Sequence, residues 1–299
     1  MALIPLNPPA AEAFDRRTAW SGPATLKYWH LASLDAPSVA VAWTCAFAWA
    51  ARVRVAPALV AVLALVVWAI YAVDRLLDAR AGIGDPGRHS LEERHWFHWR
   101  HRRFFSVAAG IAAVTAGWMI LSRLHAGALR RDSLMGLATL AYFSGVHGRG
   151  PTWVRERLGR VVSRELVVGV IFSAGCVAPV LPSAEAGVVR VCALLAAPAA
   201  AFAAVAWLNV KAIGFWEARE NGVGRIALLL TSVCGVFGIA LTGLEPRVAL
   251  LLGLVAVSSL LLAWLDEARE RMDAVTLRAA ADLALLTPLL LMVPMELAR

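Results

Sequence analysis

The chain has 299 residues, of which 60% are hydrophobic, and its mean hydropathy is +0.67. A soluble domain is usually about 45–50% apolar, so the composition excludes an ordinary soluble protein. The net charge of +8 would suit a nucleic-acid partner, but the basic residues lie between apolar segments. This arrangement favours membrane orientation and contact with lipid head groups, and we expect no nucleic-acid partner.

The first 33 residues precede the first long apolar run of the chain. Met1–Arg17 contains prolines and acids before any apolar run, which is not the pattern of a signal peptide. We interpret residues 1–33 as a cytoplasmic arm and residues 34–299 as a single transmembrane helical bundle.

The apolar segments that follow have membrane length, because about 20 helical residues cross a hydrocarbon core of about 30 Å. An apolar span of this kind must be helical to satisfy its own backbone, so the predicted fold is an all-α, polytopic bundle. The segments predict nine spans, near 34–51, 56–73, 104–122, 132–147, 164–181, 188–209, 225–243, 247–265 and 280–297. Ser144 and His147 shorten the apolar run of the fourth, and a bundle of eight spans is the alternative.

The basic residues indicate the topology. Nine spans place 21 of the 29 Lys and Arg residues on the side of the N-terminal arm. That side is therefore predicted to be cytoplasmic, in a plasma or inner membrane. The turns on the other side are short, so we expect any chemistry at the cytoplasmic mouth. The four cysteines lie inside apolar stretches without metal-ligand spacing and are interpreted as packing residues: Cys45, Cys176, Cys192 and Cys234.

A pair of carboxylates stands at the end of the second predicted span. Asp74 and Asp78 are four residues apart, so they share one helix face about a turn from each other. Two like charges at this spacing need a compensating cation, and carboxylate oxygens suit Mg²⁺. The alternative is a solvated helix end in which Arg75 or Arg80 pairs with an aspartate.

A second polar group follows the sixth predicted span. Asn209, Trp216 and Glu220 fall on one helical stripe, with Glu217 at its edge, before Gly222 ends the helix. Polar residues that face the inside of a membrane bundle are often functional. The alternative is an interfacial cap with the tryptophan at head-group depth.

Two further loops are rich in basic residues. His95, His98 and His101 recur every three residues in an Arg/His/Trp run, which suits phosphate or lipid head-group contact, or an interfacial anchor, better than metal ligation. In the loop before the fifth span, Arg164 is a candidate phosphate contact in what otherwise reads as a positive-inside loop. The chain has no P-loop, H-E-x-x-H or G-x-S-x-G motif, so ATP-driven transport and common hydrolase chemistries lack support.

These motifs resemble those of the UbiA-type membrane prenyltransferases. Residues 72–78 match the x-x-D-R-x-x-D part of that family's first motif, and Asn209, Glu217 and Glu220 stand where its second aspartate-rich motif falls. Residues 163–169 are similar to the family's fifth-helix start. The chain departs from the family in Ile70-Tyr71, which replace the leading Asn-Asp of the first motif, and in the glutamates of the second.

The resemblance implies transfer of an isoprenoid chain from a polyprenyl diphosphate to a lipophilic acceptor, which is often an aromatic ring. Mg²⁺ would be held by Asp74 and Asp78, and a second ion by Glu217 and Glu220. The residues implied in substrate contact are Arg75, Tyr71, Lys211, Arg164 and Asn209, with Tyr142, Phe215 and Trp216 as further candidate walls. The alternative is a non-catalytic member that binds an isoprenoid, a quinone or another lipid. A small transporter is the third possibility, although nearly all charges lie at span ends.

Overall fold

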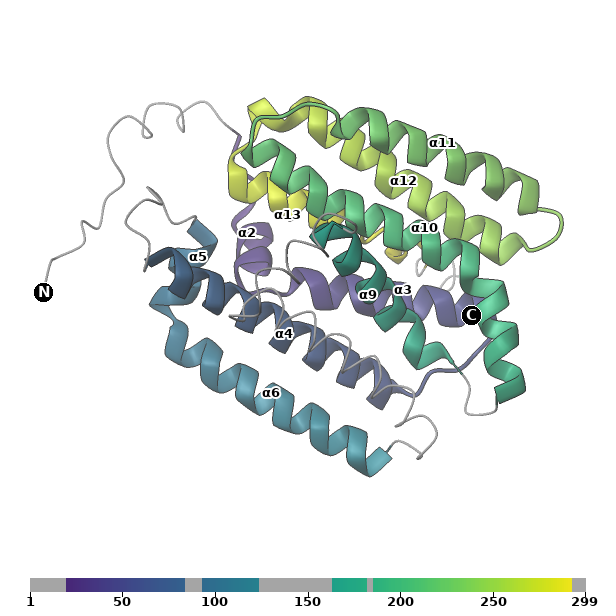
Figure 1. Ribbon diagram of the computed structural model, residues 1–299, viewed down its shortest axis with the longest axis horizontal. Coiled ribbons are helices and arrows are strands. Elements are labelled where there is room, and N and C mark those ends of the chain that lie inside the picture. The colour runs from purple at the N-terminus through teal and green to yellow at the C-terminus, as the bar shows by residue number, and fades with distance from the viewer. Residues whose placement is uncertain (1–19, 84–92, 124–162, 182–184, 292–299) are drawn as a thin grey trace, which may run out of the picture.

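The computed structural model describes residues 20–83, 93–123, 163–181 and 185–291. All of its regular elements in these ranges are helices, as the composition predicts (Figure 1). The α-helices are α2 (Ala24–Leu31), α3 (Asp35–Ala51), α4 (Pro57–Ile83), α5 (Glu93–Arg100), α6 (Arg102–Arg123), α9 (Arg164–Val177), α10 (Glu185–Glu217), α11 (Val223–Leu241), α12 (Pro246–Ala268) and α13 (Ala274–Ala284). Two 3₁₀ turns, η1 (Ala178–Val180) and η2 (Arg269–Arg271), follow α9 and α12.

Five helices in the described ranges are long and apolar enough to cross a membrane, namely α4, α6, α10, α11 and α12. The pair α2 and α3, bent by 88° between them, would make a sixth. The protein is therefore a multi-pass helical membrane protein by the length and composition of these helices. The span predicted near 132–147 lies outside the described residues.

Most predicted spans correspond to a helix, but three differ clearly in length. The sixth was expected over 188–209, whereas α10 extends beyond both ends, from Glu185 to Glu217. The second was expected to end near residue 73, whereas α4 continues to Ile83 and includes both Asp74 and Asp78. The last was expected over 280–297, whereas α13 starts earlier and ends at Ala284, and residues 292–297 lie outside the described part of the chain. Pro288 has no N–H to bond the carbonyl of Ala284, which disfavours a regular helix at this point. Side chains bond the groups around this break: Trp43 Nε1 donates to the Leu285 carbonyl at 2.9 Å, and Thr287 Oγ1 to the Leu254 carbonyl at 3.1 Å.

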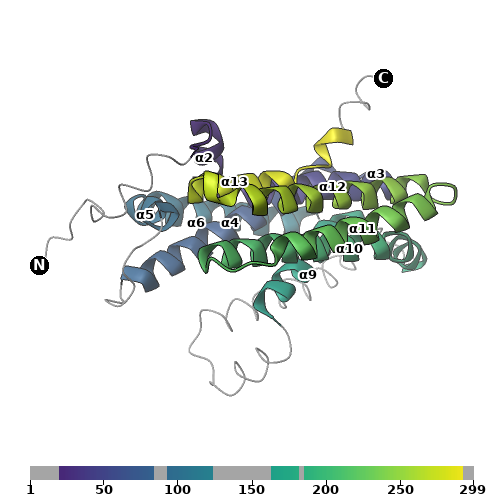
Figure 2. The ribbon, with the colours of Figure 1, turned by 90° about the horizontal axis from the view of Figure 1, so that it is seen from above.

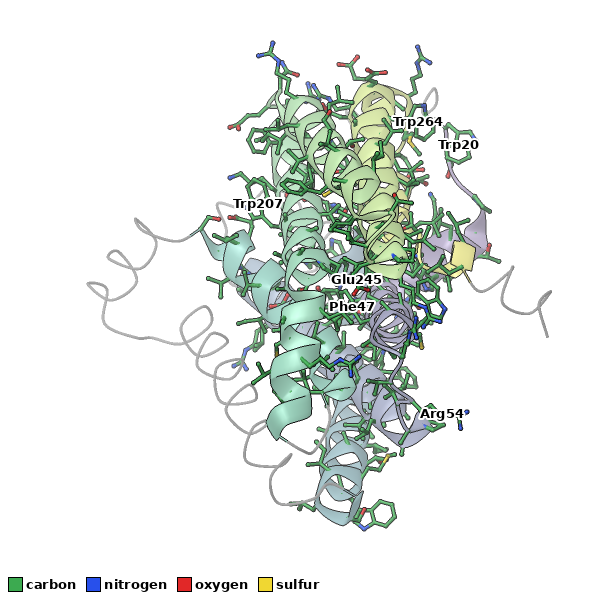
Figure 3. All side chains as sticks on the ribbon, turned by 90° about the vertical axis from the view of Figure 1, so that its right-hand side faces the viewer. Trp20, Phe47, Arg54, Trp207, Glu245 and Trp264 are labelled. Atoms are coloured by element: carbon green, nitrogen blue, oxygen red, sulfur yellow. The ribbon has the colours of Figure 1, made fainter. Side chains whose placement is uncertain are left out.

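Helix α3 is the centre of the bundle and contacts α4, α9, α10, α12 and α13. Its Trp43 stacks on Phe202 of α10 with ring centroids 4.2 Å apart, and Phe47 meets the same ring edge-on. Figure 3 shows Phe47 inside the bundle, while Trp20 and Trp264 lie at its outside. The core is therefore aromatic where α3 and α10, from distant parts of the sequence, meet.

Helix α6 packs mainly on α4, and the other described helices leave one of its apolar faces uncovered. Its exposed side chains recur every three or four residues: Phe104, Val107, Ile111, Val114, Trp118 and Leu121. A helix with such a stripe toward the outside suits lipid rather than water. Figure 2 shows the bundle edge-on, with α12, α13 and α3 in one row and α10 and α11 in another.

The two ends of the bundle differ. The turn that joins α11 to α12 lies at one end, at the right of Figure 1, and α2, α5 and α13 lie at the other. Arg247 Nη1 donates to the Trp49 carbonyl at 2.7 Å, which ties the α11–α12 turn to the end of α3. The polar site described next is at the opposite end, where α3 begins.

Candidate functional site: a buried His–Asp–Arg network

The site begins at the sharp bend between α2 and α3. Ser33 adopts a left-handed φ of 58°, which is uncommon for a residue other than glycine, and the chain then enters α3. Side chains of α4 bond two backbone carbonyls at this bend. Arg75 Nη1 donates at 2.6 Å to the His30 carbonyl, which also accepts from the Ser33 amide at 3.0 Å. Trp68 Nε1 donates at 3.0 Å to the carbonyl of Ala32, the residue after α2.

Because Trp68 and Arg75 are two helical turns apart on α4, one face of that helix holds the whole end of α2. Ser33 Oγ also lies 3.2 Å from Nε2 of His98 on α5, and the His98 ring packs on Phe105 with centroids 4.2 Å apart. His98 thus faces inward, whereas His101 is exposed and bonds the Phe97 carbonyl. Side chains of both α4 and α5 therefore stabilise the bend.

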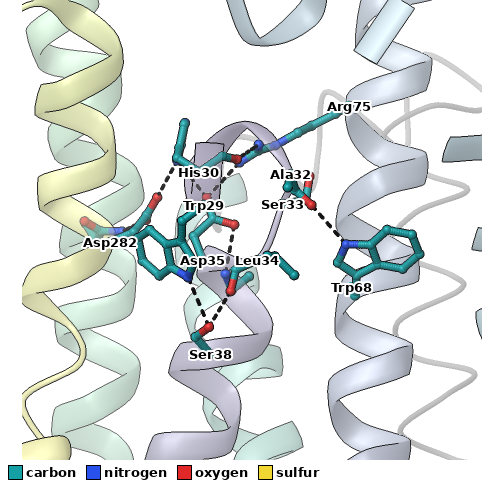
Figure 4. A network of polar contacts seen from close by, with 12 residues as sticks. Trp29, His30, Ala32, Ser33, Leu34, Asp35, Ser38, Trp68, Arg75 and Asp282 are labelled. Carbon is teal, nitrogen blue, oxygen red and sulfur yellow. Dashed lines mark hydrogen bonds and ion pairs between the residues drawn. The ribbon is translucent and has the colours of Figure 1, made fainter. Parts of the chain in front are cut away.

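Within this bend, the imidazole of His30 faces two carboxylates (Figure 4). His30 Nδ1 lies 2.7 Å from Asp35 Oδ2 and 3.1 Å from Asp282 Oδ2. His30 and Asp35 are each only 2% exposed. A carboxylate oxygen that is ionised can only accept, so Nδ1 carries the proton that both carboxylates face.

Each carboxylate has a further partner. Asp35 Oδ2 accepts from Arg75 Nη2 at 2.9 Å, and Asp35 Oδ1 accepts from the Ala36 amide at the start of α3. Asp282 Oδ1 accepts from Asn209 Nδ2 of α10 at 2.9 Å. The network therefore joins α2, α3, α4, α10 and α13 through one unbroken chain of polar contacts.

The charges of the network indicate whether it binds a proton. Two carboxylates and one guanidinium leave a net charge of −1 when His30 is neutral, and one proton on the imidazole brings the sum to zero. An unbalanced buried charge is costly, so the network is suited to taking up a single proton.

Two buried atoms of the network have no hydrogen-bond partner in the described residues, namely His30 Nε2 and Asn209 Oδ1. Buried polar atoms are nearly always bonded, so each such atom calls for an explanation. With the proton on Nδ1, Nε2 carries a lone pair, and both atoms are then hydrogen-bond acceptors.

The structure brings some of the sequence-predicted site residues to this network. Arg75 and Asn209 are direct members, and Tyr71, one turn before Arg75, lies within electrostatic range of Asp35, Asp282 and Asp74. Asp74 and Asp78 are half-buried on the last turns of α4, beside Arg75 in sequence.

Other predicted residues have separate partners. Glu217 accepts from Arg278 of α13, and Lys211 lies 5.2 Å from the centre of the Phe215 ring. Glu220 is exposed in the loop after α10, and Arg164 is the exposed first residue of α9. In the described residues, one group of three His, Cys, Asp or Glu side chains brings its ligand atoms within 4.8 Å of one another, and it is His30, Asp35 and Asp282 rather than the predicted carboxylates.

Sequence reasoning did not identify His30, Asp35 or Asp282. The one available signal was Asp282, an acid inside an otherwise apolar predicted span, since such residues are often functional. His30 lay in the predicted arm and Asp35 at the boundary of the first span, where charged residues are ordinary.

Comparisons of this chain with known protein families, with characterised proteins and with solved structures found no significant match.

Proposed function

We propose that the protein is a membrane-embedded prenyltransferase of the UbiA type, with nine spans, that acts at the cytoplasmic face of a plasma or inner membrane. Its substrates would be a polyprenyl diphosphate and a lipophilic acceptor. One observation carries the proposal: Arg75 of α4 and Asn209 of α10, from the two motif regions, belong to one buried network at one end of the bundle. A single active site formed by both motif regions would require residues of α4 and α10 to meet in this way.

The residues of α4 fit a magnesium ion in donor chemistry. Asp74 and Asp78 offer carboxylate oxygens one turn apart on the last part of α4, and Mg²⁺ prefers such oxygen ligands. A bound Mg²⁺ would neutralise the diphosphate and stabilise the charge that grows on it as the C–O bond breaks. Glu217 is engaged by Arg278, so a second ion at Glu217 and Glu220 would have to displace that guanidinium. The proposal therefore assigns the metal to Asp74 and Asp78.

The other proposed roles, which are binding the diphosphate, positioning the network and excluding water, belong to side chains of the protein. Lys211 and Arg164 are the proposed diphosphate contacts, and charge-assisted bonds of this kind are stronger than neutral ones. Arg75 is committed to Asp35 and the His30 carbonyl, so its role would be to position the network rather than to hold the phosphate. Tyr71, Phe215 and Trp216 are the proposed walls that would keep water from the allylic cation.

The test uses purified protein in lipid nanodiscs with Mg²⁺ and a series of prenyl diphosphates. We expect metal-dependent release of diphosphate, which Asp74→Asn or Asp78→Asn would lower by at least about 100-fold. Glu270→Gln, an exposed acid of η2, is the matched control and should keep wild-type turnover. Full turnover in both aspartate variants would disprove the metal assignment.

The Glu217–Arg278 ion pair favours a second candidate, a non-catalytic protein that binds an isoprenoid, a quinone or another lipid. In that case the carboxylates of the second motif serve to join α10 to α13. Thermal unfolding separates the two: only the enzyme should be stabilised by Mg²⁺ and a prenyl diphosphate together more than by the lipid alone.

A further inference from the structure

We infer that His30 is the general base of the reaction, and that the acceptor substrate carries a hydroxyl group whose proton goes to Nε2 of His30. The inference rests on the proposed function and adds to it the class of acceptor and the residue that takes its proton. It stands on the orientation of one imidazole ring and on two unsatisfied atoms.

The first step of the argument is the orientation of the ring. His30 Nδ1 is held between Asp35 Oδ2 at 2.7 Å and Asp282 Oδ2 at 3.1 Å, which fixes the tautomer with the proton on Nδ1. Nε2 then presents its lone pair on the other side of the ring. Nε2 is buried and has no hydrogen-bond partner in the described residues. An imidazole oriented by a carboxylate at one nitrogen, with an unpartnered lone pair at the other, is the arrangement of a general base.

The second step concerns the proton that such a base receives. The charged groups that face His30 are Asp35 of α3, Arg75 of α4 and Asp282 of α13. Tyr71 of α4 lies within electrostatic range of both aspartates. On the side of α5, His98 reaches the bend through Ser33. With two carboxylates against one guanidinium, the added proton gives an imidazolium in a network of zero net charge.

The third step identifies the class of acceptor. Nε2 of His30 and Oδ1 of Asn209 are both buried acceptors without a partner in the described residues. Asn209 Nδ2 is committed to Asp282, so its amide oxygen is the atom left over. Leaving such atoms unbonded costs free energy, and only a group that donates hydrogen bonds satisfies them. A hydroxyl donates, whereas its methyl ether cannot.

The step balances as follows. The C1–O bond of the prenyl diphosphate breaks, and its electron pair leaves with the diphosphate. The hydroxyl oxygen of the acceptor forms a bond to C1, and its O–H bond breaks. The proton goes to Nε2, so His30 ends as an imidazolium between Asp35 and Asp282 and returns the proton to solvent before the next turnover.

The experiment compares His30→Asn with wild type in nanodiscs. The asparagine amide can still donate to the carboxylates, but it has no atom in place of Nε2. We measure released diphosphate and prenylated acceptor separately, with a lipophilic phenol and with its methyl ether. We expect His30→Asn to keep diphosphate release, through hydrolysis, while the yield of prenylated phenol falls at least about 100-fold. Glu270→Gln, at an exposed residue of η2 outside the site, is the control and should behave as wild type.

Three outcomes decide between the claims. Retained transfer in His30→Asn, or equal transfer to the phenol and its ether in wild type, would overturn this inference and leave the prenyltransferase proposal intact. Absence of diphosphate release from wild type would instead overturn the proposed function.

Nitrogen NMR of labelled histidines tests the base without any turnover, with the His30 signal assigned as the one that His30→Asn removes. In the neutral form of the ring, a proton on Nδ1 and a lone pair on Nε2 support the inference, and the opposite tautomer overturns it.

Discussion

Asp273 connects α13 to α2 through its side chain. Its carboxylate caps α13 by accepting from the amide and the hydroxyl of Thr276 at 3.0 and 2.7 Å, and it pairs with Lys27 of α2 at 3.3 Å. Burial alone would raise the pKa of Asp273, but the bonds from Thr276 and the charge of Lys27 outweigh burial and lower that pKa. The ionised form is therefore favoured by folding.

A carboxyl whose pKa is lowered by folding contributes stability above its unfolded pKa of about 3.9 and loses it as the pH falls through the folded value. We expect Asp273→Asn to be less stable than wild type by about 1 kcal/mol at pH 7, because the ion pair with Lys27 and the negative charge at the start of α13 are lost. The difference should shrink below about pH 4. Thermal unfolding in detergent at a series of pH values checks this, and a difference that stays constant with pH would contradict it.

At the same scale, the sequence singled out two residues that prove to be members of the network. Asn209 was a polar residue on a predicted helical stripe, and Arg75 was a substrate contact implied by the resemblance of the first motif. It could not predict that His30 meets Asp282. That contact depends on the 88° bend between α2 and α3. The bend in turn depends on the left-handed conformation of Ser33, a residue type that gives no local signal for it.

At the scale of elements, α9 and α10 approach each other closely because Gly169 has no side chain. A Cβ atom at Gly169 would stand 2.6 Å from the Ala203 carbonyl oxygen and 2.9 Å from the Trp207 amide nitrogen. Ser173, one turn on, donates to the Ala199 carbonyl at 2.7 Å. Small residues that let backbones approach in this way are a usual means of helix association in membranes.

Gly169→Ala should therefore push α9 away from α10 and destabilise the protein by about 1–3 kcal/mol, since the atoms in the way are backbone. Gly175→Ala on the same helix is the matched control, because a Cβ there meets nothing within 4 Å. We expect the control to match or exceed wild-type stability, as alanine is the better helix former. Equal unfolding temperatures for the two variants would show that the pair tolerates separation.

The elements themselves follow from the sequence to different degrees. The predicted spans near 34–51 and 225–243 agree closely with α3 and α11, because their apolar runs and helix ends coincide. The end of α4 was placed almost three helical turns too early, because hydropathy falls at Asp74 while the helix continues to Ile83. The break after Ala284 was missed because the residues that compensate it, Trp43 and Ser258, are distant in sequence.

At the scale of the whole molecule, the two ends of the bundle carry different chemistry. The α11–α12 turn is tied to the end of α3 at one end. At the other end, residue 20 pairs with the loop before α13, since the Trp20 amide donates to the Arg271 carbonyl at 2.7 Å and the Asp273 amide to the Trp20 carbonyl at 3.1 Å. The positive-inside rule places this second end in the cytoplasm as a prediction.

Accessibility of single cysteines tests that orientation. In a chain whose four cysteines are replaced by alanine, Arg54→Cys lies between α3 and α4 and Glu270→Cys lies in η2. We expect a membrane-impermeant thiol reagent to label Arg54→Cys in intact cells and Glu270→Cys only after lysis. Labelling of Glu270→Cys alone in intact cells would reverse the topology and move the proposed site to the outer face.

The lengths of α4 and α10 have one further consequence. With 27 and 33 residues at about 1.5 Å each, they measure about 40 and 50 Å, well beyond a hydrocarbon core of about 30 Å. Arg75 comes about 27 Å along α4, so it stands about one hydrocarbon thickness from Pro57. The depth of the His30 imidazole is thus set by the acyl-chain length of the surrounding lipid. Lipids with short acyl chains would leave the ring at the depth of the hydrated glycerol groups. Lipids with long acyl chains would place the ring within the hydrocarbon core or reduce the tilt of the helices.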